Sequence, residues 1–134
     1  MSTRYITRAL EPVIRKAARQ LPAVVLTGPR QLGKTTLLKH LFGRIYRYVS
    51  LEPPDARTAA AVDPRGFVEM YSPPVIFDEI QYAADLLPYI KEKPDACRAK
   101  KGQYILTGSQ NLRRALLELL TSEGVAGEAS ATQR

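Results

Sequence analysis

The stretch that decides the fold is Ala-Val-Val-Leu-Thr-Gly-Pro-Arg-Gln-Leu-Gly-Lys-Thr, which occupies positions 23–35. It begins with apolar and β-branched residues, a run that is typical of a buried strand. The remainder matches the spacing G-x-x-x-x-G-K-[ST], in which Gly28 and Gly33 let the backbone curl around phosphate oxygens. A helix that begins near Lys34 adds the positive end of its dipole at the same point. The pattern therefore predicts a strand, a phosphate-binding loop and a helix in succession.

This loop, a Walker A motif, supplies the candidate nucleotide ligands. In loops of this kind the lysine, here Lys34, reaches the β- and γ-phosphates, and the hydroxyl group that follows, here Thr35, ligates Mg²⁺. We therefore expect the chain to bind a nucleoside triphosphate together with Mg²⁺. The candidate nucleotide-binding residues are Gly28, Pro29, Arg30, Gln31, Leu32, Gly33, Lys34, Thr35 and Thr36.

An acidic pair ends a second apolar run further along the chain. Residues 75–79 read Val-Ile-Phe-Asp-Glu, which suits a parallel strand that is buried on both faces. Its carboxylates would emerge at the carboxyl end of the sheet, where open α/β folds bind ligands. Asp78 is then the expected Mg²⁺ ligand, and Glu79 is the expected catalytic group that orients and deprotonates the attacking water. The alternative is an acidic strand end that only begins a solvated turn. We interpret the pair as a Walker B motif with a catalytic glutamate.

A third β-rich run at 103–111 reads Gln-Tyr-Ile-Leu-Thr-Gly-Ser-Gln-Asn. In P-loop ATPases with a catalytic glutamate, a strand between the two Walker strands ends in a polar side chain that senses the γ-phosphate. Ser109 is the first candidate for this catalytic role, Thr107 the second and Asn111 the third. The alternative is an ordinary turn and helix cap, which small polar residues also form.

Taken together, these motifs resemble the prokaryotic AAA-type ATPase domain of the AAA+ superfamily. In larger proteins this domain is often followed by an uncharacterised C-terminal domain. The resemblance covers about Arg4 to Asn111. It implies ATP as the nucleotide and an AAA+-like core with the P-loop strand central in a parallel sheet. It also implies copies of the chain or longer family members as partners. The segments that carry the resemblance are 28–36, 48–51, 78–81 and 106–111.

The chain departs from this family after Asn111. Residues 121–134 contain a single large apolar side chain, Val125, and a segment that buries so little surface is expected to form a disordered tail. We therefore expect a truncated ATPase core over residues 1–120 that lacks its last core strand. The arginine that would act on a neighbour's γ-phosphate is expected to be missing with it.

Strands and helices alternate along the chain, which predicts an α/β fold with a parallel sheet flanked by helices, of the RecA/AAA+-like P-loop NTPase class. The expected helices cover 10–20, 34–42, a helical stretch within 55–71, 86–93 and a last one that ends near residue 120. The expected strands cover 23–27, 47–51, 75–78 and the run before Ser109.

The net charge of +7 is unevenly distributed, since the first fifty residues carry ten Lys or Arg against one acid, Glu11. Part of this charge belongs to the phosphate site. Three cations, Arg15, Lys16 and Arg19, lie opposite the apolar stripe of the first expected helix. Such a face is either a nucleic-acid footprint, whose affinity would fall steeply with salt, or a solvated helix surface.

Several classes of protein are disfavoured by the composition. The single cysteine, Cys97, excludes an internal disulfide and suits a cytoplasmic protein. The chain has no secretory signal and no run of about 18 apolar residues, so we expect no membrane partner. The single histidine, His40, lacks the partners that a zinc site or a catalytic triad requires.

The sequence is compatible with three candidate functions. The first is an ATPase that hydrolyses Mg-ATP with water oriented by Glu79, and the chain is then an enzyme if complete or partnered. The second is a nucleotide-binding fragment or regulatory module without turnover. The third and weakest is a small-molecule kinase, because the segment 91–101 is a poor substitute for the arginine-rich lid that such an enzyme needs.

Overall fold

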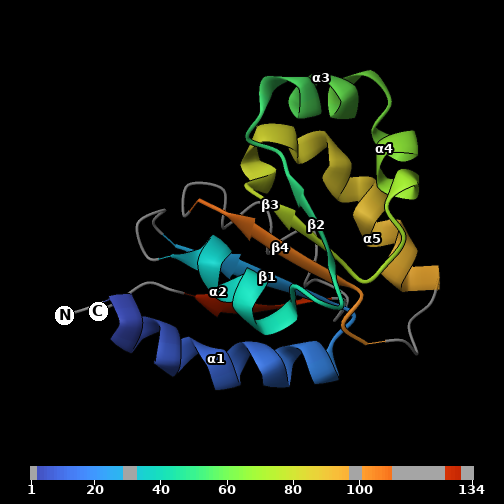
Figure 1. Cartoon of the computed structure of the whole chain (residues 1–134). Coiled ribbons are helices and arrows are strands. Elements are labelled where there is room, and N and C mark those ends of the chain that lie inside the picture. Colours follow the sequence, from blue (N-terminus) through green and yellow to red (C-terminus); the bar gives the residue numbers. More distant parts are fainter. Residues whose placement is uncertain (1–2, 29–32, 97–100, 110–125, 131–134) are drawn as a thin grey trace.

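The computed structural model describes residues 3–28, 33–96, 101–109 and 126–130. Its helices and strands alternate along the chain, and the strands gather into one sheet (Figure 1). The elements are α1 (Thr3–Gln20), β1 (Ala23–Thr27), α2 (Lys34–Phe42), β2 (Arg47–Ser50), α3 (Pro54–Val62), α4 (Pro64–Met70), β3 (Val75–Asp78), the 3₁₀ helix η2 (Ile80–Leu86), α5 (Leu87–Ala96), β4 (Tyr104–Gly108) and β5 (Ala126–Ser130).

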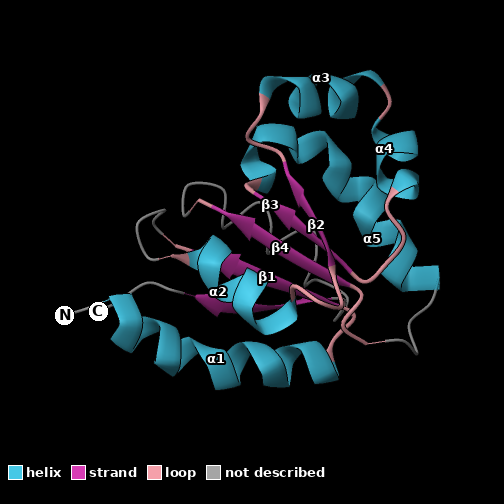
Figure 2. Ribbon diagram, viewed as in Figure 1, coloured by secondary structure: helices cyan, strands magenta, loops and turns pink. Residues whose placement is uncertain are grey.

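The sheet is parallel throughout, with the strand order β2-β3-β4-β1-β5. β1, which leads into the phosphate-binding loop, lies between β4 and β5 (Figure 2). In the register of β1 and β4, Thr27 faces Gly108, and in that of β2 and β3, Ser50 faces Asp78. The ends of these strands therefore meet at one edge of the sheet, where the α/β fold predicted from the sequence places its ligands.

Helices cover both faces of the sheet (Figure 2), and each face has its own apolar cluster. One cluster joins the sheet to α3, α4, η2 and α5, and the other joins it to α1 and α2. β1 contributes Ala23 and Val25 to the first cluster and Val24 and Leu26 to the second, because successive side chains of a strand point to opposite faces. This explains why β1 is a continuous apolar run and not an alternating one.

Two helical predictions differ from the structure in detail. The first helix begins at Thr3 rather than near residue 10, and it contains Pro12. The stretch expected within 55–71 consists of two helices, because Asp63 has non-helical backbone angles (φ −148°, ψ 81°) and caps α4 by accepting a hydrogen bond from the Gly66 N–H at 3.1 Å. A proline at the first position of the new helix removes no hydrogen bond there. The last expected helix, near residue 120, lies outside the described residues.

The fifth strand corrects the prediction that the last core strand is missing. Residues 126–130, within the segment expected to be a disordered tail, pair with β1 in parallel, and Ser130 faces Thr27. The prediction weighed large apolar side chains, but a strand is joined to a sheet by main-chain N–H and C=O groups, which every one of these residues possesses. Residues 121–125 and 131–134 lie outside the described part of the chain.

Candidate functional site

The phosphate-binding loop leaves β1 at Gly28 and enters α2 at Lys34. Gly28 and Gly33 have φ angles of 149° and 74°, values that residues with a Cβ atom rarely adopt. The Lys34 side chain is 3% exposed, and its Nζ donates to the carbonyl oxygen of Gly28 and, at 3.4 Å, to that of Gly108. The ammonium group therefore lies between the loop and the end of β4. The predicted ligands at positions 29–32 lie outside the described residues.

Asp78, at the end of β3, accepts hydrogen bonds from three hydroxyl groups. Thr35 donates to Asp78 Oδ2 at 2.7 Å, Tyr48 donates to the same oxygen, and Thr107 donates to Oδ1. Asp78 is 2% exposed, and a carboxylate buried to this degree is costly unless hydrogen bonds satisfy it. The structure thus brings together Thr35 and Asp78, the two residues that the sequence suggested as metal ligands. The neighbouring predicted ligand, Thr36, is exposed.

The oxygen atoms of Thr35 and Asp78 have the chemistry that a hard divalent cation requires. Mg²⁺ is commonly held by one or two protein oxygens, with water and phosphate oxygens completing its coordination. Among the described residues, no group of three or more His, Cys, Asp or Glu side chains could hold a metal on its own. The Thr35–Asp78 pair therefore fits a cation shared with a bound phosphate better than a dedicated structural metal.

Glu79 follows β3 directly and has an αL conformation, with φ of 62° and ψ of 51°. Its N–H donates to Thr107 Oγ1 at 2.8 Å, and its Oε1 accepts from Gln81 Nε2 at 2.8 Å. The residue is 6% exposed. Two side chains thus hold the main chain and the carboxylate of Glu79 beside the Asp78 site.

The three candidates for the sensing role lie in different environments. Thr107 is fully buried within β4 and links Asp78 to the main chain of Glu79. Ser109 is partly exposed just beyond β4, and its N–H donates to Gln81 Oε1 at 3.2 Å. Asn111 lies outside the described residues. The sensing role of the Ser109 side chain stays a prediction. The structure adds the two hydrogen bonds by which the Thr107 hydroxyl joins Asp78 to the Glu79 N–H.

Tyr48 connects the Asp78 site to the surface of α2. Burial, together with the hydrogen bond to Asp78 and the charge of that residue, raises the pKa of the Tyr48 hydroxyl well above its usual range. The ammonium group of Lys39 lies 4.4 Å from the centroid of the Tyr48 ring, a cation–π arrangement. The phenol is therefore held in its neutral form, in which it can donate to Asp78.

Sequence reasoning assigned no role to Tyr48 or Gln81, although both lie in motifs that carry the family resemblance. For Tyr48 a weak signal existed, since two-residue alternation along a strand places it on the same face as Ser50, next to the end of the neighbouring strand. For Gln81 no periodic signal existed. Its reach to both Glu79 and Ser109 depends on the turn between β3 and η2, which the apolar pattern does not encode.

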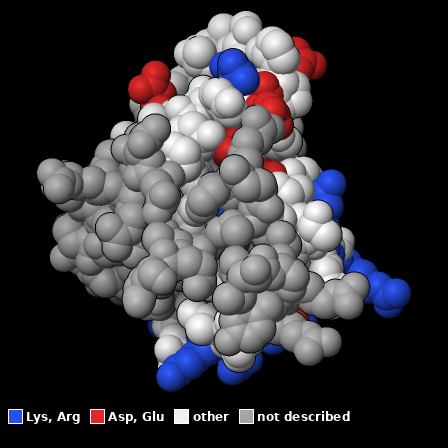
Figure 3. Space-filling model, turned by 90° about the vertical axis from the view of Figure 1, so that its left-hand side faces the viewer, with Lys and Arg blue, Asp and Glu red and all other residues white. Residues whose placement is uncertain are grey.

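The charged side chains that Figure 3 shows differ in their distribution. Lys and Arg side chains lie at the lower end, where α1 lies, and also along the right-hand side and at the top, whereas Asp and Glu side chains lie mainly in the upper half, near α3. Arg15, Lys16 and Arg19 of α1 are exposed, as the sequence pattern predicted. Within the described ranges, no helix combines the length and the apolar character needed to cross a membrane.

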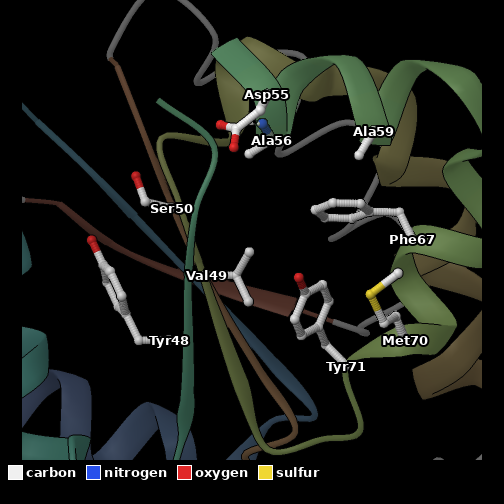
Figure 4. A pocket seen from close by; sticks show the side chains of 9 residues that line it. All are labelled: Tyr48, Val49, Ser50, Asp55, Ala56, Ala59, Phe67, Met70 and Tyr71. Carbon is white, nitrogen blue, oxygen red and sulfur yellow. Dashed lines mark hydrogen bonds between the residues drawn. The ribbon is translucent and has the colours of Figure 1, made fainter. Parts of the chain in front are cut away.

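A pocket of about 410 Å³ opens beside β2 (Figure 4). Figure 4 shows Tyr48 and Ser50 on one side of the strand and Val49 on the other, facing Phe67 and Tyr71. β2 thus presents one face to Asp78 and the other to the space in front of α3 and α4. The lining residues are Tyr48, Val49, Ser50, Asp55, Ala56, Ala59, Phe67, Met70 and Tyr71.

Comparison with known proteins places most of the chain in one family. A family model described as an AAA domain matches residues 20–126, a range that includes the phosphate-binding loop, the Asp78 strand and the Ser109 strand. Two curated relatives, each an uncharacterized protein, come from Mycobacterium bovis and Mycobacterium tuberculosis. Each is 33% identical over 117 residues, which is 85% of this chain and 25% of the relative. The chain thus spans about a quarter of the length of the curated relatives it matches.

Proposed function

The chain belongs to the AAA domain family of nucleotide-binding domains, and we propose that it binds ATP with Mg²⁺ and hydrolyses the ATP to ADP and phosphate. The observation that carries this proposal is the 2.7 Å contact between Thr35 Oγ1 and Asp78 Oδ2. It joins the start of α2 to the end of β3, so that Lys34 and Glu79 flank one small region of the sheet edge. A triphosphate and its metal need these groups together.

Each residue has a distinct task in the proposed reaction. The ammonium group of Lys34 binds β- and γ-phosphate oxygens, and Mg²⁺, held by Thr35 and Asp78, would neutralise the charge that develops on these oxygens. Glu79 accepts a proton from water as the water oxygen forms a bond to the γ-phosphorus. The bond from that phosphorus to the β–γ bridging oxygen breaks, and ADP leaves. Ser109 would contact the γ-phosphate at the end of β4.

The test separates binding from turnover. Titration of the purified chain with Mg-ATP gives the dissociation constant, and release of inorganic phosphate gives the rate. We expect Glu79→Gln to bind Mg-ATP with nearly unchanged affinity and to release phosphate about 10²- to 10⁴-fold more slowly, which is the range for loss of a general base. Glutamine keeps an acceptor oxygen for Gln81, so the variant changes charge with little change in shape.

Three other outcomes would contradict the proposal in different ways. Binding without phosphate release by the unaltered chain would identify a nucleotide-binding module. Phosphate release that survives Glu79→Gln would remove Glu79 from its catalytic role. Failure to bind ATP or any other nucleoside triphosphate would overturn the site itself, provided that the chain unfolds cooperatively in the same buffer.

We further propose that the chain acts in the cytoplasm and assembles with copies of itself or with longer family members, because its resemblance to AAA-type ATPase domains, which the family match over residues 20–126 supports, implies such partners. Mass measurement by light scattering, with and without Mg-ATP, tests the assembly. A monomer under both conditions whose hydrolysis rate is independent of protein concentration would contradict it.

A further inference from the structure

One amide group bridges the ends of β3 and β4. Gln81 Nε2 donates to Glu79 Oε1 at 2.8 Å, and Gln81 Oε1 accepts from the Ser109 N–H at 3.2 Å. A carboxylate can only accept and a main-chain N–H can only donate, so one orientation of the amide satisfies both partners. The Gln81 amide therefore uses its donor for Glu79 and its acceptor for Ser109. Each of the two hydrogen bonds sets the amide orientation that the other one needs.

The bridge ends on a peptide unit that also contacts Lys34. The carbonyl oxygen of Gly108 accepts from Lys34 Nζ at 3.4 Å, and the N–H of Ser109 belongs to the same peptide unit. The contacts thus run from Lys34 through the Gly108–Ser109 peptide and Gln81 to the carboxylate of Glu79. The residue proposed to bind phosphate and the residue proposed to activate water share one hydrogen-bonded chain.

The position of the Glu79 carboxylate must be fixed by contacts with other residues, because the backbone of Glu79 does not fix it. The residue follows the last residue of β3 in an αL conformation, and its side chain has three rotatable bonds before the oxygens. A general base works only within hydrogen-bond reach of the proton that it removes. A displacement of about 1 Å at such a position can cost about 10²-fold in rate.

We propose that Gln81 is a positioning residue that holds the Glu79 carboxylate against the Gly108–Ser109 peptide, in the place from which it acts on water. This inference rests on the proposed ATP hydrolysis, and it adds a residue that neither the Walker motifs nor the sensing strand include. Gln81 itself does not contact the reacting atoms. Its effect should therefore appear in the rate of the chemical step and not in the affinity for ATP.

Two variants separate the two contacts. Gln81→Ala removes both, whereas Gln81→Glu keeps an acceptor for the Ser109 N–H and places a second carboxylate against Glu79 Oε1. We expect both variants to lower kcat about 10- to 100-fold, while the dissociation constant for Mg-ATP changes less than about threefold. Gln20→Ala, at an exposed position of α1, is the control and should leave both quantities unchanged.

A second measurement does not depend on activity. The Ser109 amide proton should exchange faster with solvent in Gln81→Ala than in Gln81→Glu, because only the glutamate retains an acceptor. Unchanged kcat in Gln81→Ala, or losses of kcat, affinity and thermal stability in parallel, would overturn the positioning role while leaving ATP hydrolysis intact. Absence of turnover in the unaltered chain would instead overturn the proposed function, and the positioning role with it.

Discussion

Tyr48 donates its hydroxyl proton to Asp78, and its pKa is raised by burial, by that hydrogen bond and by the negative charge of Asp78. Burial also raises the pKa of Tyr46. When the folded-state pKa lies above the unfolded value of about 10, the group stabilises the fold fully below that pH, and the contribution is lost as the pH rises through the folded-state pKa. The raised pKa values of both tyrosines therefore predict that the free energy of unfolding falls in strong alkali.

We expect Tyr48→Phe to reduce this alkaline sensitivity. The urea midpoint of the unaltered chain should fall between about pH 9 and about pH 11, and that of Tyr48→Phe should fall less, because a phenylalanine ring has no ionisable proton. The fall that remains belongs in part to Tyr46. Tyr82→Phe, at an exposed ring, is the matched control and should follow the unaltered chain. Equal falls in Tyr48→Phe and the unaltered chain would show that the Asp78 contact does not hold the phenol neutral.

The residues of the candidate site were predictable to different degrees. Lys34, Thr35, Asp78 and Glu79 follow from a spacing that the chemistry of phosphate and metal demands, and the structure brings them together at one sheet edge. The link through Thr107 was not predicted. Its hydroxyl spans from Asp78 to the N–H of Glu79, and such a contact depends on which strands are neighbours in the sheet, information that a single strand's pattern does not contain.

At the level of elements, apolar periodicity predicted the strands that carry large side chains and missed the one that does not. The run 126–130 contains Ala, Gly, Glu, Ala and Ser, and its pairing with β1 relies on the main chain. On α2 the apolar spacing i, i+1, i+4 and i+5 indicates one buried stripe, and its members Leu37, Leu38, Leu41 and Phe42 are all buried. The apolar stripe expected on the first helix includes Val13 and Ile14, and on α1 Ile14 is fully buried but Val13 is 49% exposed. The apolar stripe that residue spacing predicts on α1 is therefore wider than the helix face that packs against the sheet.

Gly102 connects the loop before β4 to the segment between α1 and β1. Its N–H donates to the Leu21 carbonyl oxygen at 2.8 Å, and its own carbonyl accepts from the Tyr46 hydroxyl at 2.6 Å. Its φ is +63°, and an added Cβ would lie 2.8 Å from both the Ala18 carbonyl oxygen and the Tyr46 hydroxyl. Neither the conformation nor the space suits a larger residue.

We expect Gly102→Ala to lower the free energy of unfolding by about 2 kcal/mol, since the αL conformation alone costs a residue with Cβ about 1–2 kcal/mol and the contacts add to this. Urea unfolding of the variant measures the loss. Lys101→Ala, at the exposed neighbouring position, should change the free energy by less than about 0.5 kcal/mol. A Gly102→Ala chain as stable as the Lys101→Ala chain would mean that this loop is not fixed against α1.

For the molecule as a whole, the position of β5 decides whether β1 is an internal or an edge strand. β1 is buried at all five positions and leads directly into Gly28. With β5 in place, both of its edges are paired, to β4 and to β5. Without β5, one row of its N–H and C=O groups would lie open to solvent or to a second chain, as in other unprotected edge strands. The phosphate-binding loop would then begin at the margin of the sheet.

A chain that ends at residue 125 should therefore be less stable and more prone to associate than one that ends at residue 130. The main-chain hydrogen bonds lost with β5 contribute about 1 kcal/mol each, and ordering its residues offsets much of this. We expect a net loss of about 2 kcal/mol in the free energy of unfolding, measured by urea unfolding. The apparent mass from light scattering should rise more steeply with concentration for the shorter chain, because its β1 edge is bare. Equal midpoints and equal scattering for the two chains would mean that β5 contributes nothing to the fold, and the four-stranded core predicted from the sequence would be sufficient.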